Sequence, residues 1–360
     1  MKISSLYQWA NLLHAGFPRA CLNGYAFPPL RVGCVLTHRC NLRCAMCFVW
    51  KHGNRELAAQ ELSTGEWKRI IDQIPGQAII TFTGGEPLVR ADLTELLEHA
   101  CRNHRVHLVS NGTLFDPELI ETCLKLAPSS LLGKGLVSVG VSLEGPQEVH
   151  DAMVQVPGAF ERTTDTLRQF ATRKKNVHQR FPLLDLKIVI CRETHGSLVA
   201  LYDLAEAIGL DLISYQQCST QESSYGIDAS SENPVMKAPP PVTPIPRDAL
   251  LEELSELTAR AAGRVTELRF NPPMDLSLFA DRYENRFPLK RASCTAAWSI
   301  MHIGPYGTVF PCFSIPMGDL RTQSLKEIWN GKPYREFRRK LKKSRIFPGC
   351  IGCCVMKISR

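Results

Sequence analysis

The feature that most restricts the fold is a repeated alternation of short apolar runs and longer amphipathic segments between residues 31 and 216. Six runs have the length and composition of buried strands: Arg31–Thr37, Ala78–Thr83, Val106–Ser110, Leu136–Leu143, Leu184–Cys191 and Leu212–Tyr215. Helical periodicity is present near residues 63–74, 91–103, 116–126, 159–173 and 196–208. The alternation predicts an α/β fold with a parallel sheet covered by helices, either doubly wound or curved into a partial barrel. Both forms bind ligands at the C-terminal ends of their strands.

Two of the predicted helices are preceded by a capping signature. Ser63 is followed by Glu66, and Asp92 is followed by Glu95. In such a pair the first side chain accepts a backbone N–H of the first helical turn, and the acidic side chain bonds back to the cap. We therefore expect one helix to begin directly after Ser63 and another directly after Asp92.

The alternation ends after Tyr215, and the composition of the chain changes. Residues 219–246 are rich in Ser and Pro, which is typical of a linker. A helical pattern near 248–262 follows, and a cysteine-bearing region extends from about 293 to the end. We expect an N-terminal extension with a short amphipathic helix at 1–30, the α/β unit at 31–218, a Pro-rich linker and helix at 219–292, and a small Cys-rich domain at 293–360.

The overall composition excludes several classes of protein. Of the 360 residues, 44% are apolar and 22% are charged, which is ordinary for a globular protein and excludes a disordered or fibrous chain. No apolar stretch reaches the ~18 residues that a membrane span needs. Polar residues such as Gln8 and Asn11 interrupt the N-terminal apolar pieces, so no signal peptide is predicted. We expect a cytoplasmic protein that does not contact a membrane.

The charge is unevenly distributed. Lys and Arg number 43 against 35 Asp and Glu, a net charge of +8, and much of the excess lies between Lys332 and Arg345. Such a run is most often the solvated face of a helix, although it can also meet nucleic acid or an acidic partner. We expect the solvated face and no nucleic acid.

The 14 cysteines are the unusual part of the composition. In a long chain without an export signal they indicate metal or redox chemistry rather than disulfides. Two groups are dense: Cys40, Cys44 and Cys47, and then Cys350, Cys353 and Cys354, with Cys294 and Cys312 between the groups. Six cysteines stand singly and are expected to be small core residues: Cys21, Cys34, Cys101, Cys123, Cys191 and Cys218.

The first dense group directly follows the first predicted strand. Three thiolates at spacings of four and three can each bind one iron of a [4Fe–4S] cluster, for which four cysteines are usual. Three leave one iron open, and an open metal position is typical of catalytic sites. The alternative at this point is a zinc site that takes His38 or His52 as its fourth ligand.

The C-x3-C-x2-C spacing of Cys40, Cys44 and Cys47 resembles the signature of the radical S-adenosylmethionine (radical SAM) superfamily. Met46 and Phe48 flank the third cysteine, although the residue before it is commonly aromatic in the family. The resemblance implies a partial (β/α)6 barrel of the TIM type. It also implies that SAM chelates the open iron and that one electron cleaves it to methionine and a 5′-deoxyadenosyl radical, which abstracts a substrate hydrogen.

Further motifs at successive strand ends strengthen the resemblance. Gly84, Gly85 and Glu86 are similar to the GGE motif that holds the SAM ammonium group, and glycine permits a close approach of the backbone. Asn111 ends the third strand, and Ser142 with Glu144 resembles the ribose-binding element, in which Glu replaces Asp. Arg192 follows the fifth strand and is expected to bind the SAM carboxylate. The cofactor-binding residues that the resemblance implies are Gly84, Gly85, Glu86, Asn111, Ser142, Glu144 and Arg192.

The C-terminal cysteines resemble the auxiliary iron–sulfur domain of the SPASM or Twitch type. Cys294, Gly307 and Cys312 match the opening hairpin, and residues 324–329 match the short helix that follows it. Too few cysteines remain for two auxiliary clusters, so the resemblance implies one auxiliary [4Fe–4S] cluster with the ligands Cys294, Cys312, Cys350 and Cys353. Cys354 can replace Cys353. Four cysteines also suit structural zinc, which remains the alternative.

Members of these families modify peptides, mature sulfatases, oxidise aminocyclitol alcohols or act on cofactor precursors. We expect an oxidoreductase-like enzyme that makes an oxidative change, a crosslink or a dehydrogenation, in a peptide. The first alternative is the same chemistry on a small molecule or cofactor precursor. An RNA-modifying enzyme and a non-catalytic iron–sulfur protein are alternatives of other classes. The resemblance also implies an electron donor such as flavodoxin or ferredoxin. No acid–base residue is assigned.

Overall fold

The computed structural model describes residues 13–47, 49, 59–130, 132–220, 237–312 and 315–358. Its first half is the predicted βα alternation. Six parallel strands stand side by side in chain order: β1 (Arg31–Val35), β2 (Ile79–Thr83), β3 (Arg105–Ser110), β4 (Gly135–Ser142), β5 (Leu183–Ile190) and β6 (Leu212–Gln217). The expectation of a partial (β/α)6 barrel is therefore confirmed.

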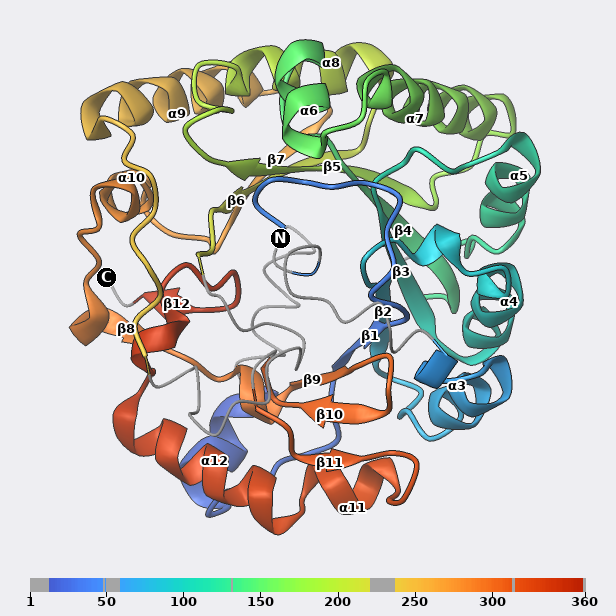
Figure 1. The fold of residues 1–360 in the computed structure, drawn as a ribbon, viewed down its shortest axis with the longest axis vertical. Coiled ribbons are helices and arrows are strands. Elements are labelled where there is room, and N and C mark those ends of the chain that lie inside the picture. Colours follow the sequence, from blue (N-terminus) through green and yellow to red (C-terminus); the bar gives the residue numbers. More distant parts are fainter. Residues whose placement is uncertain are drawn as a thin grey trace.

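The helices form an outer arc around these strands (Figure 1). They are α3 (Thr64–Ile71), α4 (Leu93–Asn103), α5 (Pro117–Lys125), α6 (Gln147–Val154), α7 (Ala159–Asn176), α8 (Leu198–Ile208) and α9 (Arg247–Ala261), with the short helix η2 (Pro87–Val89) after β2. Each crossover returns the chain to the same end of the barrel, so the C-terminal strand ends face a common mouth. The predicted pattern did not include α6, which has only eight residues.

The segment expected as a linker with one helix contains more structure than that. Residues 221–236 lie outside the described part of the chain, and α9 begins at Arg247 as predicted. Beyond it, β7 (Glu267–Asn271) pairs in parallel with β6 and extends the barrel wall. The strand is short and no more than half-buried, so its apolar signal in the sequence is weak. The helices α10 (Leu276–Asp281), η4 (Arg282–Glu284) and η5 (Leu289–Arg291) follow.

The C-terminal region joins the opposite edge of the same sheet. The strand β10 (Thr308–Phe310) is antiparallel to both of its neighbours, β9 (Ile300–Ile303) and β11 (Gly318–Asp319), and β9 pairs in parallel with β1. A separate two-stranded pair is formed by β8 (Ala292–Ser293) and β12 (Lys357–Ile358). The helices of this region are η6 (Ala296–Trp298), α11 (Leu325–Trp329), α12 (Lys332–Ser344) and η7 (Pro348–Cys350).

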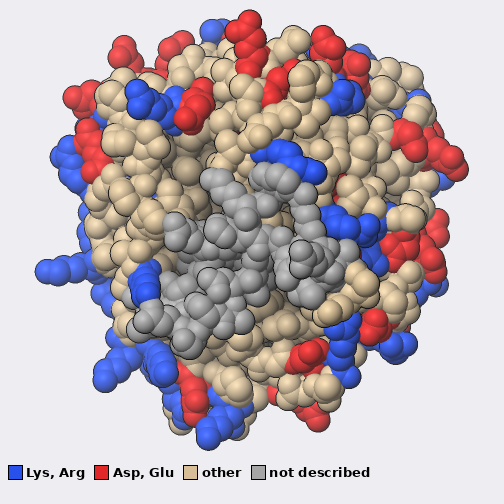
Figure 2. All heavy atoms as spheres, in the orientation of Figure 1, with Lys and Arg blue, Asp and Glu red and all other residues tan. Residues whose placement is uncertain are grey.

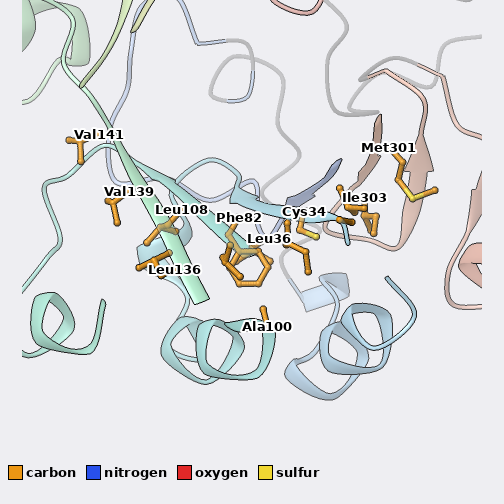
Figure 3. Close-up of a cluster of buried hydrophobic side chains, with 14 of the residues drawn as sticks. Cys34, Leu36, Phe82, Ala100, Leu108, Leu136, Val139, Val141, Met301 and Ile303 are labelled. Carbon is orange, nitrogen blue, oxygen red and sulfur yellow. The ribbon is translucent and has the colours of Figure 1, made fainter. Parts of the chain in front are cut away.

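One hydrophobic core contains residues of the barrel strands, the surrounding helices and the C-terminal strands. Figure 3 shows Phe82, Leu108 and Leu136 of neighbouring strands near Ala100 of α4, with Ile303 of β9 next to Cys34 of β1. All of these side chains are buried. The prediction for the single cysteines is confirmed for Cys34, Cys101, Cys123 and Cys191, which are buried, whereas Cys21 is exposed and Cys218 is half-buried. The expectation of a core position is therefore wrong for Cys21.

The two capping predictions have different outcomes. Ser63 and Glu66 form the complete capping box at α3. At α4 the helix begins after Asp92, but the Asp92 carboxylate makes no cap hydrogen bond. It accepts hydrogen bonds from Arg90 and Thr64 instead, because a neighbouring guanidinium is a stronger partner than a backbone N–H. Of the predicted N-terminal helix, residues 13–21 are helical, and residues 1–12 lie outside the described residues.

Candidate functional site

The first cysteine loop, residues 36–47, crosses the mouth of the barrel directly after β1 (Figure 1). Cys40 and Cys44 pack against a buried cluster formed by Leu42 of the same loop, Val154 at the end of α6 and Ala159 at the start of α7. The backbone N–H groups of residues 43 and 45 donate to carbonyl groups at the end of α6, at 3.0 and 2.8 Å. The loop is therefore attached both to its own strand and to the helix that follows β4.

The turn after β2 packs against the backbone of this loop. The N–H of Gly85 donates to the carbonyl of Thr37, and the N–H of Glu86 donates to the carbonyl of Arg39, both at 2.8 Å. A Cβ atom at Gly84 would lie 2.6 Å from the Thr37 oxygen, and one at Gly85 would lie 2.2 Å from the Arg39 oxygen. No side chain fits at either position, so the two glycines are required for contact between the turn and the cysteine loop.

Glu61 anchors the start of the loop from a different segment. Its carboxylate accepts a hydrogen bond from the Thr37 hydroxyl at 2.6 Å and one from the His38 backbone at 3.2 Å. Arg90 is buried beside it and donates to the carbonyl of Leu36 at 3.1 Å. The residues just before Cys40 are thus held by a buried carboxylate and a buried guanidinium, neither of which the sequence motifs indicated.

The Glu86 carboxylate is fully buried and its partners belong to the protein. It accepts hydrogen bonds from the Leu88 N–H at 3.0 Å, the Ser110 hydroxyl at 2.9 Å and the Asn111 N–H at 2.7 Å. Burial raises the pKa of Glu86 to about 7, although these hydrogen bonds act in the opposite direction. In this structure Glu86 ties the end of β2 to the end of β3.

Asn111 continues this chain of contacts to the first cysteine. Its side-chain amide donates to the Asn41 oxygen at 2.9 Å and lies 4.0 Å from the Cys40 sulfur. Its side-chain oxygen accepts hydrogen bonds from the backbone and the hydroxyl of Thr113, at 2.9 and 2.7 Å. Asn111 therefore connects the end of β3 directly to the cysteine loop.

The remaining predicted SAM contacts lie at the ends of β4 and β5. Ser142 is the half-buried last residue of β4. Glu144 is buried, accepts a hydrogen bond from the Val189 N–H at 3.2 Å, and donates its own N–H to the His150 ring at 3.0 Å. Burial raises the pKa of Glu144 to about 7. Arg192 follows β5 and is exposed. All seven predicted contacts thus follow successive strands at the same end of the barrel.

The donor set of the loop fits an iron–sulfur cluster. Burial raises the pKa of the Cys44 thiol, and the charges of Cys47, Glu144 and Cys40 raise it further, so the three thiols lie within electrostatic reach of one another. Within the described residues, no three His, Cys, Asp or Glu side chains converge as a single metal ion requires. In a cubane cluster each thiol binds a different iron, so the three sulfur atoms lie farther apart than the ligands of a single metal ion do. Phe48 and His52 lie outside the described residues.

One contact links the cysteine loop to the C-terminal region. The His38 ring is buried and stacks edge-on against the Tyr306 ring, with centroids 5.4 Å apart. Tyr306 lies in the turn between β9 and β10. The two cysteine-bearing regions are therefore in direct contact, through a pair of residues that are 268 positions apart and that no local motif connects.

The β8–β12 pair brings together cysteines from two distant segments. Cys294 directly follows β8, and Cys350 to Cys354 lead into β12. Burial raises the pKa of the Cys350 thiol, and the charge of Cys294 raises it further. A hydrogen bond with Cys354 and burial raise the pKa of the Cys353 thiol, to which the charges of Cys354 and Cys294 also contribute. Cys353 is half-buried and Cys354 is exposed. The structure thus brings Cys294, Cys350 and Cys353 to one place, with Cys354 beside them.

The fourth predicted auxiliary ligand, Cys312, follows β10. Burial raises the pKa of Tyr334 on α12, and the charge of Cys312 raises it further, so the Cys312 thiol lies within electrostatic reach of that helix. Gly307 forms the hairpin turn with a φ of +94°, a conformation that favours glycine. The predicted short helix is present as α11, which begins with a capping box formed by Ser324 and Glu327.

The basic run at residues 332–345 is the helix α12 and its end. Lys and Arg side chains gather over it at the lower left of Figure 2. Its exposed basic residues are Lys332, Arg339, Lys340, Lys342, Lys343 and Arg345. Arg338 is buried and stacks on Trp329 and Tyr334, 4.2 and 4.7 Å from their ring centroids. The prediction of a solvated helix face is confirmed for the exposed residues.

Comparison with known proteins agrees with this geometry. The profile of the radical SAM superfamily matches residues 34–205, and that of the SPASM iron–sulfur cluster-binding domain matches residues 294–354. The chain belongs to the radical SAM superfamily. It is therefore a radical SAM enzyme with a C-terminal SPASM-type domain, which uses S-adenosylmethionine, a [4Fe–4S] cluster and auxiliary iron–sulfur binding.

Two curated relatives and one solved structure show how far the similarity extends. An AdoMet-dependent heme synthase of Methanosarcina barkeri is 26% identical over 343 residues, 91% of this chain and 89% of that protein. A PqqA peptide cyclase of Granulibacter bethesdensis is 25% identical over 324 residues, 86% of this chain and 76% of that one. Streptococcus suis SuiB, bound to its precursor peptide SuiA, shares the fold with a TM-score of 0.64 and 16% identity, over 92% of this chain and 72% of that one.

The predicted family is thus confirmed, and so are the predicted SAM, [4Fe–4S] cluster and auxiliary iron–sulfur binding. The part of the chain that the structure describes contains no helix with both the length and the apolar character needed to cross a membrane.

Proposed function

We propose that this radical SAM enzyme makes an oxidative change, a crosslink or a dehydrogenation, in a peptide. The observation that carries the proposal is the relation to a PqqA peptide cyclase, which extends over 86% of the chain. The shared fold with SuiB is consistent with it. When bound, the first cluster and SAM supply the hydrogen-abstracting 5′-deoxyadenosyl radical, and the auxiliary cluster supplies an electron acceptor.

Cys40, Cys44 and Cys47 are the proposed ligands of the first cluster. Support comes from their shared loop at the barrel mouth and from the mutual influence of their thiols. The proposed SAM contacts are Gly84, Gly85, Glu86, Asn111, Ser142, Glu144 and Arg192. In the structure Glu86 and Asn111 also hold the loop in place through hydrogen bonds with the protein, so we propose that they position the cluster as well as SAM.

One auxiliary [4Fe–4S] cluster is proposed, with Cys294, Cys312, Cys350 and Cys353 as its ligands. The gathering of Cys294, Cys350 and Cys353 by the β8–β12 pair supports this set. Cys353 is favoured over Cys354 because its side chain is less exposed. We also propose the domain limits predicted from the sequence, with β7 as an additional strand of the barrel wall.

A second candidate is the same chemistry on a small molecule or cofactor precursor. The relation to an AdoMet-dependent heme synthase favours it, since that relation extends over 91% of the chain. For either substrate, we propose that flavodoxin or ferredoxin donates the electron. The exposed basic face of α12 supports an acidic protein partner of this kind. We propose the cytoplasm as the compartment, because a reducing environment keeps these thiols available for iron.

The experiment is a substrate comparison on anaerobically reconstituted protein with SAM and dithionite. One arm contains a synthetic peptide for each short reading frame found next to the gene, and the other contains an iron porphyrin with carboxylate side chains. We expect faster formation of 5′-deoxyadenosine with the peptide, and a peptide mass that is lower by two hydrogens. Turnover of the porphyrin with an unchanged peptide would contradict the proposal and establish the second candidate.

A further inference from the structure

The surface beside the auxiliary cysteines is strongly basic. It is formed by residues 13–28 and residues 332–345, and we call it the α12 face. Residues 13–28 include one Arg and no acidic residue, whereas residues 332–345 include eight Lys and Arg and one acidic residue, Glu336. Most of the basic side chains of α12 are exposed, and they are visible at the lower left of Figure 2. A surface with this charge balance attracts acidic partners.

The two segments of the α12 face are joined by hydrogen bonds. The Lys342 ammonium donates to the carbonyl of Ala20 at 2.9 Å, at the end of the N-terminal helix. Arg335 donates to the Tyr25 hydroxyl at 2.7 Å, and its guanidinium lies 4.7 Å from the centroid of the Tyr25 ring. In Figure 1 the N-terminal helix, drawn in blue, lies against α12. The α12 face is therefore one continuous surface.

The part of this face contributed by the N-terminal segment is apolar as well as exposed. The rings of Phe17 and Phe27 stack with centroids 6.1 Å apart, and Leu13 lies one helical turn before Phe17. The exposed fractions of Leu13, Phe17 and Phe27 are 70%, 54% and 39%. Exposed aromatic residues next to Arg and Lys are typical of protein interfaces. A surface that bound only phosphate groups would not need these apolar side chains.

The C-terminal end of the α12 face adjoins the auxiliary cysteines. The backbone N–H of Cys294 donates to the carbonyl of Arg345 at 3.0 Å. The next residue, Ile346, belongs to a buried cluster against which Cys350 and Cys353 pack. A protein that docks on the α12 face therefore lies against the auxiliary cysteine site. A protein that carries an electron needs this proximity, because electron transfer requires a short distance, whereas a nucleic acid does not.

We propose that the α12 face docks an acidic one-electron carrier protein beside the auxiliary cysteine site. The exchange of an electron there rests on the auxiliary cluster of the proposed function, whereas the docking does not. One electron passes from the reduced cluster to the oxidised carrier, so the cluster is oxidised by one electron and the carrier is reduced by one. No bond of either protein forms or breaks, and a flavin carrier also takes one proton from water.

The first test is calorimetric binding to anaerobically reconstituted protein at low and high salt. The probes are an acidic flavodoxin, an acidic [4Fe–4S] ferredoxin and a single-stranded oligouridine RNA. Arg339→Glu/Lys343→Glu reverses two exposed charges one turn apart on α12, and Arg339→Gln/Lys343→Gln only removes them. Lys125→Glu/Lys175→Glu is the matched control. It reverses two exposed charges on α5 and α7, which lie across the molecule from α12 (Figure 1).

We expect at least one carrier to bind wild type and the α5/α7 control equally, and to bind more weakly at high salt. The affinity for this carrier should fall by about tenfold or more in the charge-reversed α12 variant and by less in the charge-removed variant. Phe17→Ala should weaken binding by about threefold or more. Binding of neither carrier, tighter binding of the RNA, or equal losses in the α12 and α5/α7 reversals would overturn the proposal.

A second test follows the electron. The auxiliary cluster of the Cys40/Cys44/Cys47→Ala variant is reduced, the excess reductant is removed, and oxidised carrier is added in a stopped-flow instrument. The α12 charge reversal should slow reduction of the carrier by about tenfold but leave the reaction with a small neutral quinone unchanged. Equal slowing of both reactions, or a docked carrier that is not reduced, would overturn the proposal. Reduction of the carrier by an enzyme that leaves every peptide unmodified would contradict the proposed function but support this docking surface.

Discussion

The two cysteine-bearing regions are held in place in different ways. The first cysteine loop is attached along its length by hydrogen bonds to the turn after β2, to Asn111 after β3 and to the end of α6. The cysteines around Cys294 and Cys350 are gathered by β8 and β12, two strands of two residues each. We therefore expect the barrel to form the first site before any cluster binds, and the auxiliary site to depend more on the cluster itself.

The largest difference between the regions is expected from Gly85→Ala. A Cβ atom at this position would lie 2.2 Å from the Arg39 backbone oxygen, so the turn and the cysteine loop must separate. We expect 5′-deoxyadenosine formation to fall by about tenfold or more, while iron at the auxiliary site is retained. Gly65→Ala on α3 is the control, because its nearest neighbour would be 3.9 Å away. Equal SAM cleavage by the two variants would show that the turn does not hold the loop.

Arg338→Met tests the auxiliary side of the comparison. The buried Arg338 guanidinium donates to the carbonyl groups of Ala297 at 2.7 Å and Gly24 at 3.0 Å. Removing it leaves these groups unpaired, and we expect the free energy of unfolding of the C-terminal region to fall by about 3 kcal/mol. Denaturant unfolding, followed by hydrogen exchange in β8–β12, measures this loss. Arg339→Met, which changes the exposed neighbour, should have little effect. Equal losses in the two variants would contradict the assignment.

The pairing of β9 with β1 joins the C-terminal region to the barrel, and we expect its stability to depend on pH through His302. This β9 side chain lies against Gly33 of β1, and burial lowers its pKa from 6.5 to about 4. The folded state therefore resists protonation, and stability is complete above pH 6.5 and is lost as the pH falls toward 4. One such group contributes up to about 1.4 kcal/mol per pH unit. Urea unfolding between pH 7 and 4.5 should give a shallower dependence for His302→Gln. Parallel curves for variant and wild type would contradict this.

The smallest effects are expected from a matched pair of capping variants, one in each region. Ser63 and Ser324 form the same capping box, at α3 beside the barrel and at α11 in the auxiliary region. Ser63→Ala and Ser324→Ala should each lower the free energy of unfolding by about 1 kcal/mol. Neither variant should lose iron, since neither serine touches a cysteine loop. Iron loss in only one of the two variants would show that the helix capped by that serine helps to hold the neighbouring cluster, which would contradict this prediction.

The sequence predicted those parts of the fold that depend on local pattern. The six barrel strands are predominantly apolar, so their positions were predictable. In β7 only Leu268 and Phe270 are apolar and the strand is half-exposed, so the pattern is too weak to indicate it. The parallel pairing of β9 with β1 joins residues that are far apart in the chain, and no local signal predicts such a pairing.

The candidate site likewise contains residues that the sequence indicated and residues that it did not. Cysteine spacing and the motifs after successive strands indicated the loop and the residues around it. Glu61 and the His38–Tyr306 stack were not indicated, because each acts through contacts between segments that are distant in sequence. The Asp92 cap illustrates a further limit. A capping signature specifies where a helix begins, but it does not show whether a nearby guanidinium, here that of Arg90, takes the carboxylate.

Iron and sulfide analysis with electron paramagnetic resonance tests the central claim most directly. Anaerobically reconstituted wild type is compared with a Cys40/Cys44/Cys47→Ala variant and a Cys294/Cys350/Cys353→Ala variant, each with SAM and dithionite. We predict about eight irons in wild type and about four in each variant, with 5′-deoxyadenosine lost in the first variant. About four irons in wild type, all absent from the first variant, would contradict the auxiliary cluster and leave the C-terminal cysteines to zinc or free thiols.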